Sequence, residues 1–315
     1  MVVSARTVLV TGGAGFVGVN LGRLLRDEGF RTRCFDNFTT GSRADAEAAG
    51  YDEIVEGDIR HLEQLAEAVS DVDLVVHLAA QSGVPTSVAD PVHDCELNVR
   101  GTLNALIASR DAGVQGFVMA SSSAPLGPTT PPVDERTVPR PISPYGASKL
   151  AGEAYCSAFA GSYGLPTVAL RFTNVYGPYS YHKGSVVAAF CKAAASDEPM
   201  VIHGDGSQTR DFVFVEDLCR GMVQALTSGA AGMVAHLGSG TETSIAEVAN
   251  EIAVRFPGDV PTQHVEERVG DIPRTYADIS LARRELGYNP TTSLQDGLDA
   301  TVAWFREADL SGAAG

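Results

Sequence analysis

Two side chains that can move a proton lie four residues apart in the stretch PYGASKL, residues 144–150. They are Tyr145 and Lys149, and the lysine is unusual in a chain with three lysines against twenty arginines. On a helix this spacing places both side chains on one face, and Pro144 suits the first turn of such a helix. A nearby ammonium favours the charged form of a phenol and lowers its pKa. The pattern indicates a tyrosine that takes a proton from a hydroxyl; the alternative is an exposed helix start with an arbitrary cation.

A glycine-rich turn near the N-terminus predicts where a dinucleotide binds. Gly12, Gly15 and Gly18 separate a β-branched run from an amphipathic run in TVLVTGGAGFVGVNLGRLL. Such glycines let backbone amides approach a pyrophosphate at a helix N-terminus, although a tight turn without a ligand can carry the same residues. Asp36 ends the next predicted strand, where a carboxylate can accept both hydroxyls of an adenosine ribose and repel a 2′-phosphate. We therefore expect NAD rather than NADP.

A hydroxyl group is expected at the end of the strand that precedes the Tyr145 helix. The stretch MASSSAPLG supplies Ser121, Ser122 and Ser123 there. One of these hydroxyls can hydrogen-bond the reacting oxygen, and an oxidised nicotinamide would favour the phenolate of Tyr145 further. Together these residues predict hydride transfer between NAD and a carbinol.

The elements that must hold these groups alternate between short β-branched runs and longer helical patterns. This alternation predicts a Rossmann-type α/β fold, a doubly wound parallel sheet covered by helices on both faces. Strands are expected at 7–12, 31–37, 53–58, 73–80, 116–123 and 167–175, and helices near 16–29, 61–69, 91–112 and 145–163.

The regular alternation ends after residue 175, which suggests a second, smaller unit. We expect an NAD-binding domain over 1–175, to which about 209–236 returns. A smaller C-terminal α/β lobe, over about 176–208 and 237–315, is expected to bind the substrate. Helices of this part are expected near 184–196, 244–256, 280–287 and 293–307.

The composition restricts the partners and the compartment. A net charge of −16 argues against a nucleic acid or an anionic membrane as partner. The five scattered cysteines show neither metal-ligand spacing nor a disulfide framework, so we expect no metal and buried thiols in a reducing cytoplasm. The sequence shows no signal peptide, and no apolar run approaches the roughly 18 residues of a membrane span. We expect a cytoplasmic protein.

Over nearly its whole length the chain resembles the extended branch of the short-chain dehydrogenase/reductase superfamily, which acts on nucleotide sugars. The stretches that carry the resemblance are TGGAGFVG, EGDIR, HLAAQ, NVRGTLNAL, YGASK, RFTNVYGP, GDGSQTRDFVFVED and GDIPRTYADISLARRELGY. It implies an NAD-dependent enzyme and a homodimer. The cofactor contacts it implies are Gly12, Gly15, Phe16, Val17, Gly18, Asp36, Asn37, Asp58, Ile59, Leu78, Ala79, Ala80, Gln81, Asn98, Ser121, Tyr145, Lys149 and Phe172.

Within that branch, the residues after the serine strand separate two reactions. Nucleotide-sugar 4,6-dehydratases typically carry Thr-Asp-Glu there, because removing water needs a general acid and a base. This chain has Ser122, Ser123 and Ala124 instead. Ser122 matches the catalytic hydroxyl position of the family, and Ser123 is the second candidate. The resemblance therefore implies a 4-epimerase of UDP-glucuronate or of UDP-glucose/galactose; a 4,6-dehydratase, an epimerase at another carbon and a non-catalytic NAD sensor are the alternatives.

The resemblance also implies cations for the diphosphate of such a substrate. Arg210 and Arg268 match the arginines that clamp the pyrophosphate in the family. Asn174 matches an asparagine that contacts phosphate, and Ser185 and Val186 lie where uridine is usually held.

The chain departs from the family pattern at two places. Tyr179 stands where many relatives have arginine, and the unusual His182 and Lys183 follow it. These two either serve a sugar carboxylate in place of that arginine or lie on a solvated loop. Leu126 replaces a tyrosine that often lines the site. The remaining substrate contacts that we expect are Ser82, Gly83, Val84, Ser122, Ser123, Tyr145 and Asp271.

Overall fold

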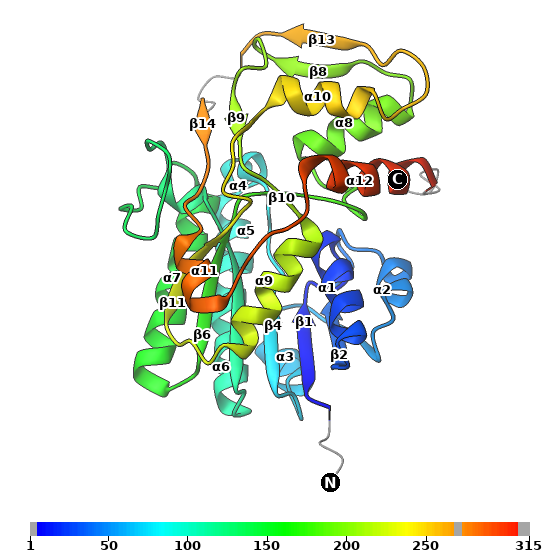
Figure 1. Ribbon diagram of the computed structural model, residues 1–315. Coiled ribbons are helices and arrows are strands. Elements are labelled where there is room, and N and C mark those ends of the chain that lie inside the picture. Colours follow the sequence, from blue (N-terminus) through cyan, green and yellow to red (C-terminus); the bar gives the residue numbers. More distant parts are fainter. Residues whose placement is uncertain (1–4, 268–272, 308–315) are drawn as a thin grey trace.

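The computed structural model describes residues 5–267 and 273–307, and its centre is a seven-stranded parallel sheet (Figure 1). The strand order is β11-β6-β5-β4-β1-β2-β3, which is the order of a doubly wound dinucleotide-binding sheet with one added strand. The predicted fold class is confirmed. The strands are β1 (Thr7–Thr11), β2 (Arg31–Asp36), β3 (Glu53–Glu56), β4 (Leu74–His77), β5 (Gly116–Ser122), β6 (Thr167–Phe172) and β11 (Met233–Leu237), of which β11 was not expected as a strand.

Each face of this sheet carries its own apolar core. In β1, Val8 and Val10 belong to one core and Leu9 to the other, because successive side chains of a strand point to opposite faces. One face is covered by α1 (Phe16–Asp27), α2 (Arg43–Ala49) and α9 (Val215–Thr227). The other is covered by α3 (Leu62–Ala68), α6 (Gly101–Asp111) and α7 (Pro144–Tyr163).

The helix expected near 91–112 is divided into three parts. They are α5 (Pro91–Cys95), a π-helix over Glu96–Arg100 and α6, and α5 is preceded by α4 (Val84–Ala89). Inside the π-turn, Asn98 exchanges two hydrogen bonds of 2.9 Å with the main chain of Gln81. Helices α2, α4 and α9 were not expected from the sequence. The interruption of the long helix gives Asn98 a fixed position beside the end of β4.

The strand expected over 167–175 also divides, into β6 and β7 (Asn174–Tyr176). β7 leaves the central sheet and pairs in parallel with β10 (Phe212–Phe214). The division falls at Thr173, whose N–H bonds Leu237 O at 3.1 Å, whereas Asn174 N–H bonds Asp211 O at 2.9 Å. The change of partner leads the chain out of the central sheet.

The smaller half gathers at the top of Figure 1. There α8 (Val186–Ala195), α10 (Ile245–Ala253) and α12 (Leu294–Glu307) pack on one another. Two small sheets accompany them: β8 (Met200–His203) with β13 (Thr262–Val265), and β9 (Thr209–Arg210) between β12 (Thr243–Ser244) and β14 (Arg274–Thr275).

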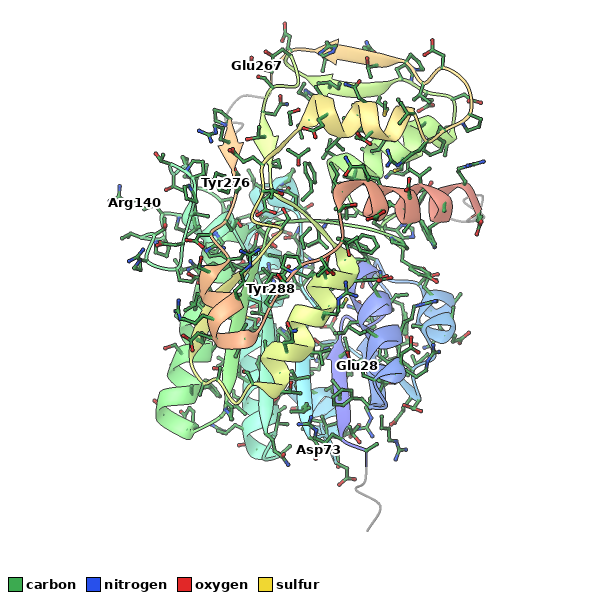
Figure 2. The ribbon with its side chains drawn as sticks, in the orientation of Figure 1. Glu28, Asp73, Arg140, Glu267, Tyr276 and Tyr288 are labelled. Atoms are coloured by element: carbon green, nitrogen blue, oxygen red, sulfur yellow. The ribbon has the colours of Figure 1, made fainter. Side chains whose placement is uncertain are left out.

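A last helix, α11 (Ser280–Leu286), packs against β11 and α9. Tyr288 follows it and lies in the interior (Figure 2), where its hydroxyl donates to Gly238 O at 2.8 Å. Of the helices in the described residues, none is long and apolar enough to cross a bilayer.

Candidate active site

The structure brings Tyr145, Lys149 and Ser122 together at the carboxyl end of β5. Helix α7 begins at Pro144 and is capped by Ser143, whose hydroxyl accepts a hydrogen bond from Gly146 N–H at 3.1 Å. The Lys149 ammonium lies 5.8 Å from the centroid of the Tyr145 ring and donates to Ala120 O at 2.9 Å. A hydrogen bond joins the side chains of Tyr145 and Ser122. A short helix cap and one strand end therefore place the three groups that the sequence singled out.

Burial dominates the electrostatics of this group. It lowers the pKa of Lys149 to about 8, while the charges of Asp94 and Glu153 oppose the shift. Burial also raises the pKa of Tyr145, and the hydrogen bond to Ser122 opposes that rise. The lowered pKa expected for Tyr145 from the lysine spacing is therefore not produced by the protein groups alone, because burial disfavours the phenolate.

Asp94 is a residue of this site that the sequence analysis missed. It lies on α5 and is 1% exposed, and its Oδ1 accepts a hydrogen bond from Asn98 Nδ2 at 2.9 Å. Its charge acts on both Tyr145 and Lys149. In the sequence it is one more carboxylate in a helical pattern, and only the packing of α5 against α7 reveals it.

The glycine turn has the shape that a dinucleotide requires. Gly12 has φ +71°, and a Cβ there would lie 2.6 Å from Ala79 N. A Cβ on Gly18 would lie 2.6 Å from Gly13 Cα, so this glycine lets α1 pack on the turn. A Cβ on Gly15 would meet only Gly12 O, at 3.4 Å. The space over Gly15, at the N-terminus of α1, is thus open to a ligand, and the residues fit a bound pyrophosphate.

The acidic residue after β2 is tied to the same turn. Asp36 accepts hydrogen bonds from Phe38 N–H at 2.8 Å and from Ala14 N–H at 3.0 Å. Next to it, Asn37 Nδ2 donates to Asp58 Oδ2 at 3.2 Å, and Arg60 holds the pKa of Asp58 well below its usual range. Ile59 is buried beside them. Asp36, Asn37, Asp58 and Ile59 thus lie together at or just after the carboxyl ends of β2 and β3, where we expect the adenosine of NAD.

Most of the other expected cofactor residues lie close to the glycine turn, but the side chain of Ser121 points away from it. Phe16 and Val17 begin α1, and Leu78, Ala79 and Ala80 follow β4, where Leu78 N–H bonds Thr11 O at 3.0 Å. The Ser121 hydroxyl instead donates to Glu153 Oε1 at 2.6 Å and is 3% exposed. Its side chain points into a buried cluster, because Glu153 is held there by Arg171 at 2.8 Å.

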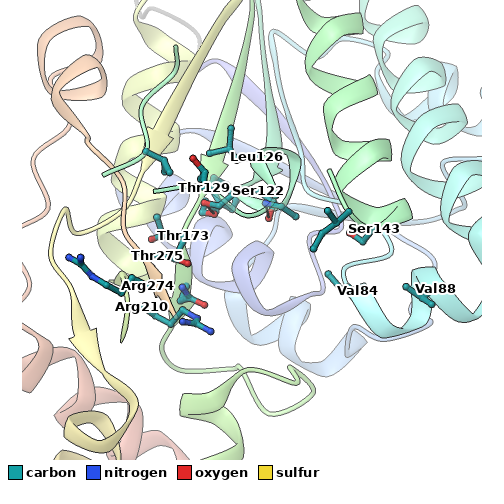
Figure 3. Close-up of a pocket in the computed structure, with 17 residues that line it drawn as sticks. Val84, Val88, Ser122, Leu126, Thr129, Ser143, Thr173, Arg210, Arg274 and Thr275 are labelled. Carbon is teal, nitrogen blue, oxygen red and sulfur yellow. Dashed lines mark hydrogen bonds between the residues drawn. The ribbon is translucent and has the colours of Figure 1, made fainter. Parts of the chain in front are cut away.

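A cavity of about 380 Å³ opens in front of Ser122 (Figure 3). In that view Arg210 and Arg274 lie on the side away from Val84 and Val88. Residues predicted for substrate or cofactor that line it are Val84, Ser122, Ser123, Phe172, Asn174 and Arg210. Lining residues that were not predicted are Val88, Ala124, Gly127, Thr129, Val133, Ile142, Ser143, Thr173, Arg274 and Thr275, and Leu126 lines the cavity as well.

Arg274 joins the cavity through a strand pairing. β14 pairs in parallel with β9, which places Arg274 and Thr275 opposite Thr209 and Arg210. Arg274 also makes a two-point ion pair with Glu242, with distances of 3.0 and 2.6 Å. No local pattern pointed to it, because the pairing joins segments 65 residues apart.

Several other predicted substrate residues do not line this cavity. Ser82 and Gly83 precede α4, and Ser185 and Val186 form the start of α8. Tyr179 accepts a hydrogen bond from Arg23 Nη1 at 3.1 Å. His182 and Lys183 lie near Asp45 and Phe16 on the α1–α2 side. Tyr145 does not line the cavity either, although its neighbour Ser122 does. Arg268 and Asp271 lie outside the described residues.

The fold and site together define an NAD-binding enzyme of the short-chain dehydrogenase/reductase type. The chain belongs to the NAD dependent epimerase/dehydratase family, whose profile matches residues 8–238. A UDP-glucose 4-epimerase of Mycolicibacterium smegmatis is 37% identical over 312 residues, which cover 95% of this chain and 98% of that protein. The expected family and the expected cofactor, NAD, are confirmed.

Solved structures agree with this assignment. A UDP-glucose 4-epimerase from Thermotoga maritima, solved with UDP-glucose, superposes with a TM-score of 0.90 at 32% identity, over 96% of this chain and 99% of that one. A UDP-glucuronic acid 4-epimerase mutant from Bacillus cereus, solved with NAD and a fluorinated UDP-glucuronic acid, gives a TM-score of 0.88 at 31% identity, over 96% and 99%.

Proposed function

We propose that the protein is a 4-epimerase that inverts C4 of a UDP-hexose. The observation that carries this proposal is the group of Ser122, Tyr145 and Lys149, of which Ser122 lines a cavity that no carboxylate of the described residues lines. Elimination of water would need an acid and a base at the sugar, whereas epimerisation needs one group that exchanges a proton with the C4 hydroxyl.

The three side chains divide the proton transfer between them. Tyr145 as phenolate takes the proton of the C4 hydroxyl, and the Ser122 hydroxyl donates a hydrogen bond to the same oxygen. The Lys149 ammonium favours the phenolate. NAD, when bound, supplies a reversible hydride acceptor for C4. Tyr145 returns the proton after the 4-keto sugar has presented its other face, which leaves the enzyme unchanged at the end of each cycle.

The cations of the cavity suit the diphosphate. Arg210 and Arg274 lie on adjacent strands at one side of the cavity, and guanidinium pairs match the geometry of phosphate oxygens. The names of the related epimerases support a UDP-sugar, either UDP-glucose/galactose or UDP-glucuronate. We further propose that the central sheet and its helices bind NAD and that the half around α8, α10 and α12 holds the nucleotide. A homodimer in the cytoplasm completes the proposal.

The experiment is incubation with UDP-glucose and, separately, with UDP-glucuronate, followed by NMR of the sugar. We expect the C4 epimer of at least one of them. Tyr145→Phe should keep NAD bound and lose turnover by at least about a hundredfold, the contribution of a general base. Tyr163→Phe, which changes an exposed tyrosine at the other end of α7, is the matched control and should keep full turnover.

Three outcomes would contradict the proposal. Absence of both C4 epimers would remove the substrate assignment. A product lighter by one water would identify the protein as the alternative that the family admits, a 4,6-dehydratase. Full turnover by Tyr145→Phe would show that another group is the base.

A further inference from the structure

Lys183 lies over the N-terminus of the helix that follows the glycine turn. Its ammonium is 5.1 Å from the centroid of the Phe16 ring and donates to Val175 O at 2.9 Å. Phe16 is the first residue of α1 and directly follows Gly15. The ammonium therefore lies against the side chain of the first residue of α1, and Lys183 does not line the cavity in front of Ser122.

The loop that carries Lys183, residues 177–185, is fastened across α1. Asn20 Nδ2 donates to Pro178 O at 3.0 Å, and Arg23 Nη1 donates to the Tyr179 hydroxyl at 3.1 Å. Within the loop, Lys183 N–H bonds Ser180 O at 2.9 Å. Because two side chains of α1 hold the loop, the position of the ammonium relative to the helix start is defined.

The surroundings of Lys183 are positive and lack a compensating acid. No carboxylate of the described residues contributes to its pKa, which burial lowers to about 8. The first turn of α1 contains no acidic residue, while its unpaired N–H groups and the helix dipole add positive potential. A partly desolvated ammonium without a counter-charge is costly. The chain as a whole has a net charge of −16, so a positive site without a carboxylate is unusual in it. We therefore expect this site to bind an anion.

We propose that Lys183 binds the pyrophosphate of NAD and that the 177–185 loop thereby holds the cofactor in place. The Lys183 ammonium packs on the ring of Phe16, the residue that follows Gly15 at the helix start where an anion is favoured. The proposal rests on NAD binding at the glycine turn and, through the proposed function, on a reaction that restores NAD in each cycle. An enzyme of that kind gains from slow loss of its cofactor, because no step requires exchange.

The test measures the exchange of NAD in the holoenzyme. Protein loaded with isotope-labelled NAD is diluted into excess unlabelled NAD, and the retained label is followed. Lys183→Met should speed release by about ten- to one-hundred-fold, the effect of removing a hydrogen bond to a charged group, and Lys183→Arg should restore most of the retention. Lys192→Met is the matched control, since Lys192 also lies over a ring, 5.2 Å from the centroid of Tyr181, and should exchange at the wild-type rate.

Two further measurements separate binding of the cofactor by the Lys183 charge from a structural role of Lys183 and from a role in binding UDP. Lys183→Gln keeps a donor for Val175 O without the charge, so fast exchange in this variant with an unchanged circular dichroism spectrum assigns the effect to the charge. Affinity for UDP, measured by calorimetry, should be unchanged in both variants. The proposal is overturned if exchange equals that of Lys192→Met, or if UDP binding weakens while NAD exchange does not. Exchange is measured without a sugar, so its result is independent of whether C4 epimers form.

Discussion

Single residues show that burial, more than neighbouring charge, sets the protonation states near the active site. His77 ends β4 below the glycine turn and is 2% exposed. Its Nδ1 lies 2.8 Å from Thr11 Oγ1 and its Nε2 lies 3.1 Å from Thr102 Oγ1. Burial and the charge of Lys149 lower its pKa to about 3. A neutral imidazole thus joins β4 to β1 and α6, and protonation would place another cation in the core near Lys149.

This arrangement predicts a pH dependence of stability that His77→Gln removes. Between pH values of about 6.5 and 3, the unfolded chain binds one more proton at this residue than the folded protein, so the free energy of unfolding rises with pH. Acidification from about pH 7 to about pH 5 should therefore cost the wild type about 2 kcal/mol that the variant does not lose. Urea unfolding at both pH values, with NAD in fixed excess, measures the difference.

The control is His61→Gln, which changes an exposed histidine at the start of α3. It should keep the wild-type loss of stability on acidification. An equal loss in the His77→Gln protein would show that His77 does not carry this proton.

At the level of elements, the contact between the glycine turn and α1 gives the glycines of the turn different roles. Gly12 and Gly18 stand where backbone passes too closely for a Cβ, whereas Gly15 faces open space. The three glycines of the motif therefore have two different roles. Gly12 lets the turn pack on the residues that follow β4, and Gly18 lets α1 pack on the turn. Gly15 leaves room for a ligand.

Substitutions at these glycines should consequently have different effects. Gly18→Ala should lower the free energy of unfolding by about 1–3 kcal/mol, because an inserted methyl group must move backbone. Gly15→Val should leave that free energy nearly unchanged, since Gly15 has φ −80°, and should abolish co-purification of NAD. Urea unfolding and the NAD content of the purified protein measure the two effects.

Gly161→Ala on α7 is the control, because a Cβ there meets nothing within 4 Å. It should leave the NAD content unchanged and should not lower the free energy of unfolding, because alanine is the better helix former. Wild-type NAD content in Gly15→Val would mean that the cofactor does not pass over this glycine.

The elements and residues that sequence could predict are those defined by local spacing. The six alternating strands, the glycine turn and the Tyr145–Lys149 pair all depend on residues within one or two turns of each other. Arg274 and Asp94 could not be found in this way, since strand pairing and helix packing bring them to the site. The effect of burial on Tyr145 could not be predicted in this way either, because burial among the protein's own groups, which raises the pKa of its phenol, is a property of the folded chain.

In the whole molecule, Asp211 joins segments that are distant in sequence where the chain passes between its two halves. It is fully buried, and it accepts hydrogen bonds from Ser239 N–H and Oγ, both at 2.7 Å, and from Gly240 N–H at 3.2 Å. Ala277 N–H donates at 3.3 Å and Thr173 Oγ1 at 3.3 Å. One carboxylate therefore connects the ends of β6 and β11 with the segment after β14, next to Arg210 in the cavity.

Asp211→Asn should destabilise the protein and weaken substrate binding together. The amide NH₂ would face donors in place of one acceptor oxygen, and unsatisfied buried donors cost about 1–3 kcal/mol each, so we expect a loss on the order of 3 kcal/mol in urea unfolding. Displacement of Thr173 and Arg210 should raise KM for the UDP-sugar more than it lowers kcat, because both line the cavity and neither belongs to the Ser122, Tyr145 and Lys149 group. Asp205→Asn, at an exposed turn, is the control and should change neither quantity. Wild-type stability in Asp211→Asn would show that the junction between the two halves does not depend on this carboxylate.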